Sequence, residues 1–351
     1  MKFFGGIILA GGILLAQASY ADSVKCESVF NKKGALSSEQ GLRSKGYLKI
    51  SNGRQFWVDY TAPVNGKPTV VLVNGLTYST KQWELFAKQL TAKGIGVVRY
   101  DMFGMGKTLL KNIPIWKMIP YERQAQDLKD ILEHLEIPEP YNLVGLSYGG
   151  AIATEFAARF PKLSNKVILM APFTRPIKEQ DEWIKQQVKI NRVLNPLNPA
   201  TDVQLYDFYL KQIIYSTYPA AEPISLENYP YKLEAIFRMV QSVRHWPYEK
   251  AVNMLPQKTL HLMIAGNDQY IKREVMEDAW KSVDSKTRAS RIIVGGAEHK
   301  IPEDVPNFSA AWVEMIINDH PLLKDGAWFW GDSKTGRVEH SDGEFRLPKD
   351  D

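Results

Sequence analysis

The sequence predicts an α/β fold with a mostly parallel, twisted sheet, helices on both faces and an inserted, mainly helical lid. Two observations lead to this prediction. Short apolar runs alternate with helix-length amphipathic stretches over residues 69–170 and again over 259–318, and this alternation is typical of a parallel sheet with right-handed crossovers. Residues 172–257 break the alternation and are dense in aromatic side chains, which indicates an insertion.

The strands are predicted from apolar runs that turn residues separate. An Asn52-Gly53 pair joins the first two runs and is a strong hairpin signal. The apolar run Thr69–Val73 suits a strand that is buried on both faces. Strands are expected at 46–50, 55–60, 69–73, 97–100, 141–146, 167–170, 259–265 and 291–294, and helices at 81–92, 121–135, 149–160, 273–283 and 308–318.

The chain is accordingly divided into consecutive segments. They are a signal peptide (1–21), an N-terminal extension (22–44), the first part of the core (45–171), the lid insertion (172–257), the second part of the core (258–319) and a C-terminal arm (320–351). The arm contains Trp328-Phe-Trp330. We expect it to form a short hairpin or an extended segment that packs these aromatic side chains on the body.

Residues 1–21 have the features of a cleavable secretory signal peptide. Lys2 precedes an apolar run, and the small residues Ala18-Ser19-Tyr-Ala21 precede the expected cleavage point after Ala21. The apolar run contains four glycines and is shorter than the ~20 residues that a spanning helix needs. We therefore expect a periplasmic or secreted protein with no transmembrane segment in the mature chain; retention of the segment as an N-terminal anchor is the alternative.

The composition narrows the class of protein. The 351 residues are 44% hydrophobic and 24% charged, which is ordinary for a globular protein with a sizeable core. The net charge of +5 is spread without basic blocks, so nucleic-acid binding is not indicated. Cys26 is the only cysteine, which excludes an intrachain disulfide and a cysteine-based metal site.

A candidate nucleophile lies in Gly145-Leu-Ser-Tyr-Gly149, which fits G-x-S-x-G between a predicted strand and a predicted helix. In this setting the turn is tight, and a Cβ atom at either glycine would collide with neighbouring backbone. The N-terminus of the following helix directs free N–H groups at any negative charge that forms there. Ser147 is therefore the candidate nucleophile, and a packed turn without catalytic role is the alternative.

A serine hydroxyl needs a general base, and histidine is suited to this task because its pKa lies at about 6.5. Of six histidines, only His299 lies in a loop just past the carboxyl end of a predicted strand. Asp268 follows the preceding strand and is the candidate acid that orients His299; it could instead be a helix cap, with Asp181 as the acid. The order Ser147, Asp268, His299 is that of serine hydrolases on such sheets.

The oxyanion of a tetrahedral intermediate needs two backbone N–H donors. One is expected from Tyr148, the residue after the nucleophile, and the other from Leu76 in the loop after the first buried parallel strand. Gly75 lets the backbone turn the Leu76 amide inward.

Other segments resemble a phosphate-binding loop and a zinc site but lack a residue that each pattern requires. Gly104-Met-Gly-Lys-Thr108 resembles the end of a phosphate-binding loop, but Asp101 occupies the position of its first glycine. Neither Glu133-His134 nor Glu298-His299 has a second histidine at helical spacing, so no zinc site is indicated. We expect no metal and no organic cofactor.

Taken together, these residues resemble the α/β-hydrolase family, in the esterase- and lipase-like branch with a serine nucleophile and a helical lid. The resemblance covers about residues 47–318 and rests on Val71-Leu-Val-Asn-Gly-Leu76 with Trp83, Asp101-Met-Phe-Gly-Met-Gly106, Gly145–Gly150, Gly266-Asn-Asp268 and His299. It implies that Ser147 is the nucleophile, His299 the base and Asp268 its partner, and that Leu76 and Tyr148 donate to the oxyanion.

The chain departs from the family pattern at some positions. Asn74-Gly75 stands where the family often has His-Gly, and Phe103 stands where an arginine is common. Because position 147 holds serine and not aspartate, the resemblance disfavours the dehalogenase and epoxide hydrolase members, whose chemistry needs a carboxylate nucleophile.

The sequence thus predicts a serine hydrolase that cleaves a carboxylic ester, of lipophilic character, through an acyl-enzyme on Ser147. The lipophilic preference rests on the aromatic residues of the predicted lid, which would line the pocket. Cleavage of amides or peptides, of thioesters or of carbon–carbon bonds would use the same triad. A non-catalytic binding protein of this fold is the alternative outside the enzymes.

Overall fold

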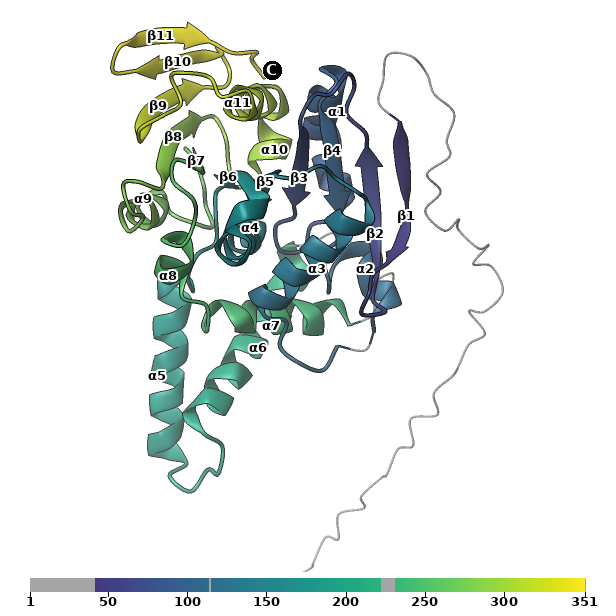
Figure 1. Ribbon diagram of the computed structural model, residues 1–351. Helices are drawn as coiled ribbons and strands as arrows, with labels where there is room; N and C mark the ends of the chain where they lie inside the picture. Colours follow the sequence, from purple (N-terminus) through teal and green to yellow (C-terminus); the bar gives the residue numbers. More distant parts are fainter. Residues whose placement is uncertain (1–41, 114, 222–230, 351) are drawn as a thin grey trace, which may run out of the picture.

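The computed structural model describes residues 42–113, 115–221 and 231–350, which form one twisted sheet with helices on both faces (Figure 1). The predicted signal peptide and most of the predicted N-terminal extension lie outside the described residues. The sheet has eleven strands in the order β1-β2-β4-β3-β5-β6-β7-β8-β9-β10-β11. They are β1 (Arg43–Lys49), β2 (Gln55–Thr61), β3 (Thr69–Val73), β4 (Gly96–Tyr100), β5 (Tyr141–Leu146), β6 (Ser164–Met170), β7 (Leu260–Ala265), β8 (Arg288–Gly295), β9 (Ala327–Asp332), β10 (Arg337–His340) and β11 (Gly343–Arg346).

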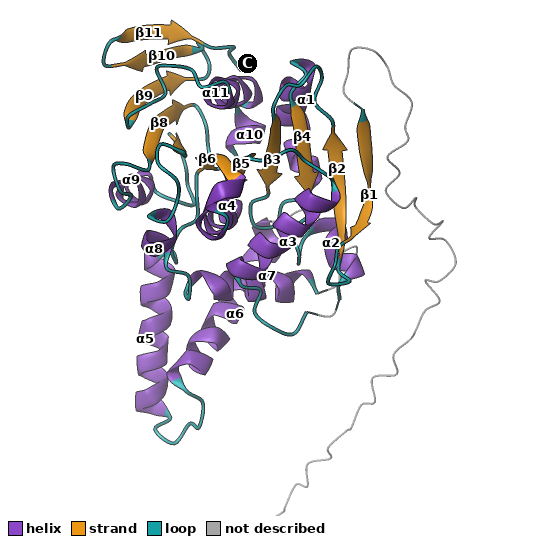
Figure 2. Cartoon of the chain, viewed as in Figure 1, coloured by secondary structure: helices purple, strands orange, loops and turns teal. Residues whose placement is uncertain are grey.

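Helices lie on both sides of the sheet, as Figure 2 shows. They are α1 (Glu84–Ala92), α2 (Gly106–Lys111), α3 (Tyr121–His134), α4 (Tyr148–Arg159), α5 (Lys178–Leu194), α6 (Asp202–Ala221), α7 (Lys232–Val243), α8 (Tyr248–Val252), α9 (Arg273–Lys281), α10 (Ile301–Asp304) and α11 (Pro306–Ile317), with short 3-10 helices η1 (Thr80–Trp83) and η2 (Pro161–Leu163).

The centre of the sheet is parallel and its two edges are antiparallel. Strands β4, β3, β5, β6, β7, β8 and β9 run parallel to one another, whereas β1 and β2 at one edge and β10 and β11 at the other pair antiparallel with their neighbours. The β1–β2 pair, with Lys49 opposite Gln55, confirms the hairpin predicted from Asn52-Gly53. The fold class predicted from the sequence is correct.

The central strands consist of apolar residues because both faces of the sheet are covered. All of β5 and most of β3 are buried, and helix α3 packs against α4 while α1 packs against α11. The register places Val73, the last residue of β3, opposite Gly145 of β5. The loops that leave these two strands therefore begin side by side.

Helices α5 to α8 are inserted between β6 and β7, within the range 172–257 that was predicted to be a lid. Helices α5 and α6 form a hairpin that projects away from the sheet (Figure 1), and α7 lies near α4. The insertion is anchored to the core by Trp246 Nε1, which donates a hydrogen bond to Glu155 Oε2 at 2.9 Å.

Some boundaries differ from those that the apolar pattern predicted. The predicted helix 81–92 begins as the 3-10 helix η1, and the short helices α2 and α10 were not predicted. Each of these two spans at most six residues, which is too short for an amphipathic repeat to stand out in a sequence.

The C-terminal segment continues the sheet. Strand β9 pairs in parallel with β8, and β10 and β11 follow as a hairpin, where the sequence predicted a short hairpin or an arm. Because side chains alternate along a strand, Phe329 is buried against Trp312 whereas Trp328 is 44% exposed. Asp350 then accepts hydrogen bonds from the backbone N–H groups of Asn307 and Phe308, at 2.8 and 2.9 Å.

These last contacts predict that Asp350 stabilises the fold. In Asp350→Ala two N–H groups in the first turn of α11 lose their acceptor, and we expect the free energy of unfolding to fall by about 1 to 2 kcal/mol. Urea denaturation measures this loss. Asp342→Ala in the exposed β10–β11 turn is the control and should change little; equal stability of the two variants would contradict the prediction.

Candidate active site

The turn between β5 and α4 holds Ser147 in a strained backbone conformation. Its φ and ψ are 50° and −116°, a region that residues with a side chain rarely adopt. A Cβ atom on Gly145 would lie 2.5 Å from the Gly149 carbonyl oxygen, and one on Gly149 would lie 2.2 Å from that of Val73. Both glycines are therefore required by the close approach of neighbouring backbone.

His299 and Asp268 form a hydrogen-bonded pair. His299 Nδ1 lies 2.8 Å from Asp268 Oδ2, and the Asp268 side chain is fully buried while that of His299 is 15% exposed. A carboxylate can only accept, so Nδ1 carries the proton and Nε2 is left to accept one. The other oxygen, Oδ1, accepts from the N–H groups of Tyr270 and Ile271, each at 2.8 Å. Asp268 is thus a cap for its own turn and the partner of the histidine.

A cavity of about 200 Å³ brings the predicted residues together. Ser147, His299 and Leu76 all line it, and Asp268 lies behind His299. In the described part of the chain no direct hydrogen bond joins the Ser147 hydroxyl to His299. The bond between a nucleophile and its base is often long until substrate binds.

The two predicted oxyanion donors flank the nucleophile. A Cβ atom on Gly75 would lie 3.5 Å from Ser147 Cβ, so the loop that carries Leu76 passes close to the serine. Tyr148 is the first residue of α4, where the N–H groups have no partner within the helix. Among the hydrogen bonds of the described residues, none is donated by either amide.

Asn74 has a structural task in the same loop. Its side chain is fully buried, accepts a hydrogen bond from Trp83 Nε1 at 2.7 Å and donates one to the Tyr100 carbonyl oxygen at 2.9 Å. These bonds tie the end of β3 to the end of β4. The departure from His-Gly at this position therefore leaves the loop well supported.

Asp101 supports the loop from the other side. Its two oxygens accept hydrogen bonds from the N–H groups of Thr80 and Lys107, both at 2.7 Å. Burial raises the pKa of Asp101 to about 6, although these N–H groups favour the charged form. A Cβ atom on Gly106 would lie 2.2 Å from Asp101 Oδ2, which explains the glycine at the end of this motif.

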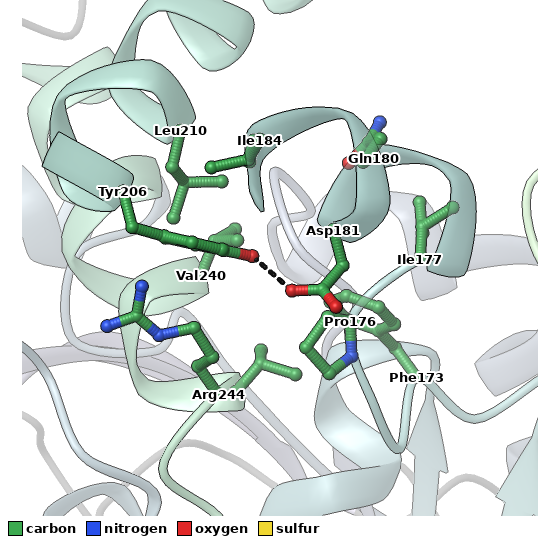
Figure 3. A pocket seen from close by; sticks show the side chains of 11 residues that line it. Phe173, Pro176, Ile177, Gln180, Asp181, Ile184, Tyr206, Leu210, Val240 and Arg244 are labelled. Atoms are coloured by element: carbon green, nitrogen blue, oxygen red, sulfur yellow. Dashed lines mark hydrogen bonds between the residues drawn. The ribbon is translucent and has the colours of Figure 1, made fainter. Parts of the chain in front are cut away.

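Asp181, the alternative acid, is bound elsewhere. It lies on α5, where the Tyr206 hydroxyl donates a hydrogen bond to its Oδ1 at 2.7 Å (Figure 3), and it also pairs with Lys185. Both contacts are with the inserted helices. Among the described residues, the acid hydrogen-bonded to His299 is therefore Asp268 and not Asp181.

Tyr148 also has a contact that the sequence did not reveal. Its side chain is fully buried, and its hydroxyl donates to the Met239 carbonyl oxygen and lies 3.3 Å from Ser242 Oγ, both on α7. Burial raises the pKa of this phenol. Next to the pair, the Tyr270 ring packs edge-on against His299 with centroids 5.3 Å apart. No local pattern marks either aromatic ring, since each contact depends on tertiary packing.

The described residues contain no group of three or more His, Cys, Asp or Glu side chains that could hold a metal ion. In the same part of the chain, none of the helices combines the length and apolar character that crossing a bilayer requires.

Known proteins that are similar to this chain include hydrolases and peptidases. Residues 65–305 match the family model described as "Serine aminopeptidase, S33". A human (lyso)-N-acylphosphatidylethanolamine lipase is 22% identical over 301 residues, covering 78% of this chain and 86% of the lipase. The chain spans only about half the length of two other relatives, 51% of one from Bacillus subtilis and 48% of one from Mycoplasma genitalium.

Solved structures share the fold. An α/β hydrolase from a Medee basin deep-sea metagenome library superposes with a TM-score of 0.55 at 19% identity, over 78% of this chain and 97% of that one. A thermophilic esterase from Thermogutta terrifontis does so with a TM-score of 0.54 at 17% identity, over 78% and 98%. With the family model covering more than half of its length, the chain belongs to the α/β-hydrolase family with a serine nucleophile, in the group described as serine aminopeptidase S33.

Proposed function

We propose that this protein is a serine hydrolase that cleaves a lipophilic carboxylic ester through an acyl-enzyme on Ser147. The observation that carries the proposal is a single cavity whose wall holds Ser147 and His299 and is otherwise mostly apolar. The α/β-hydrolase family supports hydrolysis as the reaction type, whereas the ester and its lipophilic character rest on the cavity.

The proposed reaction follows from the positions of the groups. His299 Nε2 takes the proton of the Ser147 hydroxyl while Oγ attacks the ester carbonyl carbon, and the N–H groups of Leu76 and Tyr148 donate to the resulting oxyanion. Collapse of this intermediate breaks the bond to the alcohol, which leaves with the proton from His299. Water then attacks the acyl-enzyme by the same steps, and Asp268 stabilises the imidazolium in each half of the reaction.

The cavity lining favours an apolar substrate. The aliphatic and aromatic residues among its lining are Leu76, Tyr78, Phe173, Ile177, Leu210, Ile213, Ile214, Val240, Tyr270 and Ile271. Several of them belong to the inserted helices, which supports a role of the insertion as a lid over the cavity. The name of the human lipase relative is in line with such a substrate.

The charges of the cavity lining favour ester hydrolysis over peptide cleavage. An aminopeptidase must bind the α-ammonium group of its substrate, which calls for a carboxylate near the nucleophile. None of the described residues that line the cavity is acidic, and Lys300 adds a cation. Cleavage of an amide, thioester or carbon–carbon bond would use the same triad. Assays with substrates of each kind distinguish these reactions from ester hydrolysis.

We expect esters with medium to long acyl chains to be hydrolysed, and aminoacyl p-nitroanilides to be left intact. A substrate panel measured by product release tests this, with Ser147→Ala as the blank, which should also fail to react with a fluorophosphonate probe. Labelling of Ser147→Ala as strong as that of the natural protein would remove the nucleophile from the proposal. A panel without turnover would favour the non-catalytic binding protein.

The Asp268 carboxylate is expected to contribute to turnover through His299. Asp268→Asn keeps an oxygen for the N–H groups of Tyr270 and Ile271. It no longer holds His299 in the tautomer with the proton on Nδ1, so kcat should fall by about four orders of magnitude. The control is Asp181→Asn, which alters the pair with Tyr206 and should leave kcat nearly unchanged. If the two variants exchanged these outcomes, Asp181 would be the acid.

We also propose that the protein is secreted or periplasmic, on the basis of the signal-peptide features of residues 1–21. N-terminal sequencing of the protein recovered from its native compartment should begin at Asp22. A chain that still starts at Met1 would contradict cleavage and favour an N-terminal anchor.

A further inference from the structure

The tip of the α5–α6 hairpin exposes large aliphatic side chains to solvent. Val193, Leu194 and Leu197 are 79%, 71% and 93% exposed, and the hairpin that carries them projects away from the sheet (Figure 1). Single exposed apolar residues are common on proteins. A contiguous group at the end of a projecting element instead marks a surface that meets an apolar partner.

The tip is a turn whose polar side chains form hydrogen bonds to other groups of the same turn. Arg192 donates to the carbonyl oxygens of Asn198 and Ala200 and to the carboxylate of Asp202. Asn198 Nδ2 donates to Asn191 Oδ1 at 3.0 Å. The polar groups thus bond to one another while the aliphatic groups face outward, which is the reverse of an ordinary solvent-facing loop.

The apolar surface continues from the tip along the hairpin. Ile190 and Trp183 of α5 are 42% and 45% exposed, and their spacing of seven residues places them on one side of the helix. Phe208 of α6 is 55% exposed. The Tyr209 ring contacts the rings of both Trp183 and Phe208, at centroid distances of 6.2 and 5.3 Å, so both exposed rings border the same tyrosine.

The charges around the tip are of both signs, but the unpaired one is cationic. Arg192 pairs with Asp202 and Lys185 pairs with Asp181, whereas Lys189 has no ion pair in the described part of the chain. Residues 185–201 include Lys185, Lys189 and Arg192 and no acidic residue. Lys189 is exposed. Cationic side chains next to an exposed apolar group are the combination that binds the surface of an anionic bilayer, where headgroups attract the cations and the apolar groups enter the acyl boundary.

We propose that the α5–α6 tip, with Val193, Leu194 and Leu197 at its apex, docks on an anionic phospholipid surface. A second protein is a poorer occupant, because a stable protein interface buries about 800 Å² on each partner and a convex turn offers little area. A bilayer needs no shape complementarity. The proposal goes beyond ester hydrolysis and does not depend on it.

A fluorescent reporter at the apex tests the proposal. Cys26 is the only natural cysteine, so Leu197→Cys in a Cys26→Ser background can be labelled with nitrobenzoxadiazole. On adding vesicles of phosphatidylcholine with phosphatidylglycerol, we expect a blue shift and a several-fold rise in emission, and a smaller response to phosphatidylcholine alone. A label at Leu85→Cys, 56% exposed on α1, is the control and should not respond.

Because the reporter is local, adsorption of vesicles through residues 1–21 would not reproduce the expected result. No change at position 197, or equal changes at positions 197 and 85, would overturn the proposal. So would a response that follows protein concentration without vesicles, since the tip would then join two copies of the chain.

A second variant separates docking from folding. Adding Val193→Asp and Leu194→Asp to the labelled chain should abolish the vesicle response while leaving the hydrolysis of a short soluble ester unchanged. If the reporter still responded fully, the apex aliphatic residues would not be the docking surface. Far-ultraviolet circular dichroism checks the fold in case the short ester is not a substrate.

Discussion

The close approach of Gly149 to the carbonyl oxygen of Val73 is the contact on which the rest of the site depends. It brings the N-terminus of α4 against the end of β3, with no room for a Cβ atom between them. Ser147 is held above the sheet by this contact, and the loop with Gly75 and Leu76 is held beside the serine. A larger residue at position 149 would separate the nucleophile from one of its two candidate oxyanion donors.

Much of the fold could be predicted because parallel strands have a simple sequence pattern. Runs such as Thr69–Val73 and Tyr141–Leu146 are apolar since they are covered on both faces. The three residues of the candidate triad could be placed on one edge because the carboxyl ends of parallel strands share it. The family, the parallel sheet and its covering helices agree with this prediction, while the catalytic roles stay predictions.

Other features could not be read from the chain because they depend on distant partners. Strand β9 pairs with β8 although the helices α10 and α11 lie between them in the chain, and the buried Phe329 stands between two more exposed tryptophans. The acceptor for the first turn of α11 is Asp350, more than forty residues away. From the sequence the two functions of Asp268 are alternatives, yet a carboxylate has two oxygens: Oδ1 accepts from the backbone and Oδ2 lies against His299.

Tyr148 joins the chemistry to the inserted helices in one residue. Its backbone N–H is a proposed oxyanion donor, and its hydroxyl donates a hydrogen bond to the backbone of α7. Displacing α7 would take two partners from a buried phenol, and an unsatisfied buried polar group costs about 1 to 3 kcal/mol. The inserted helix α7 is therefore tied to the nucleophile turn itself, and a displacement of α7 would break hydrogen bonds to the residue that follows Ser147.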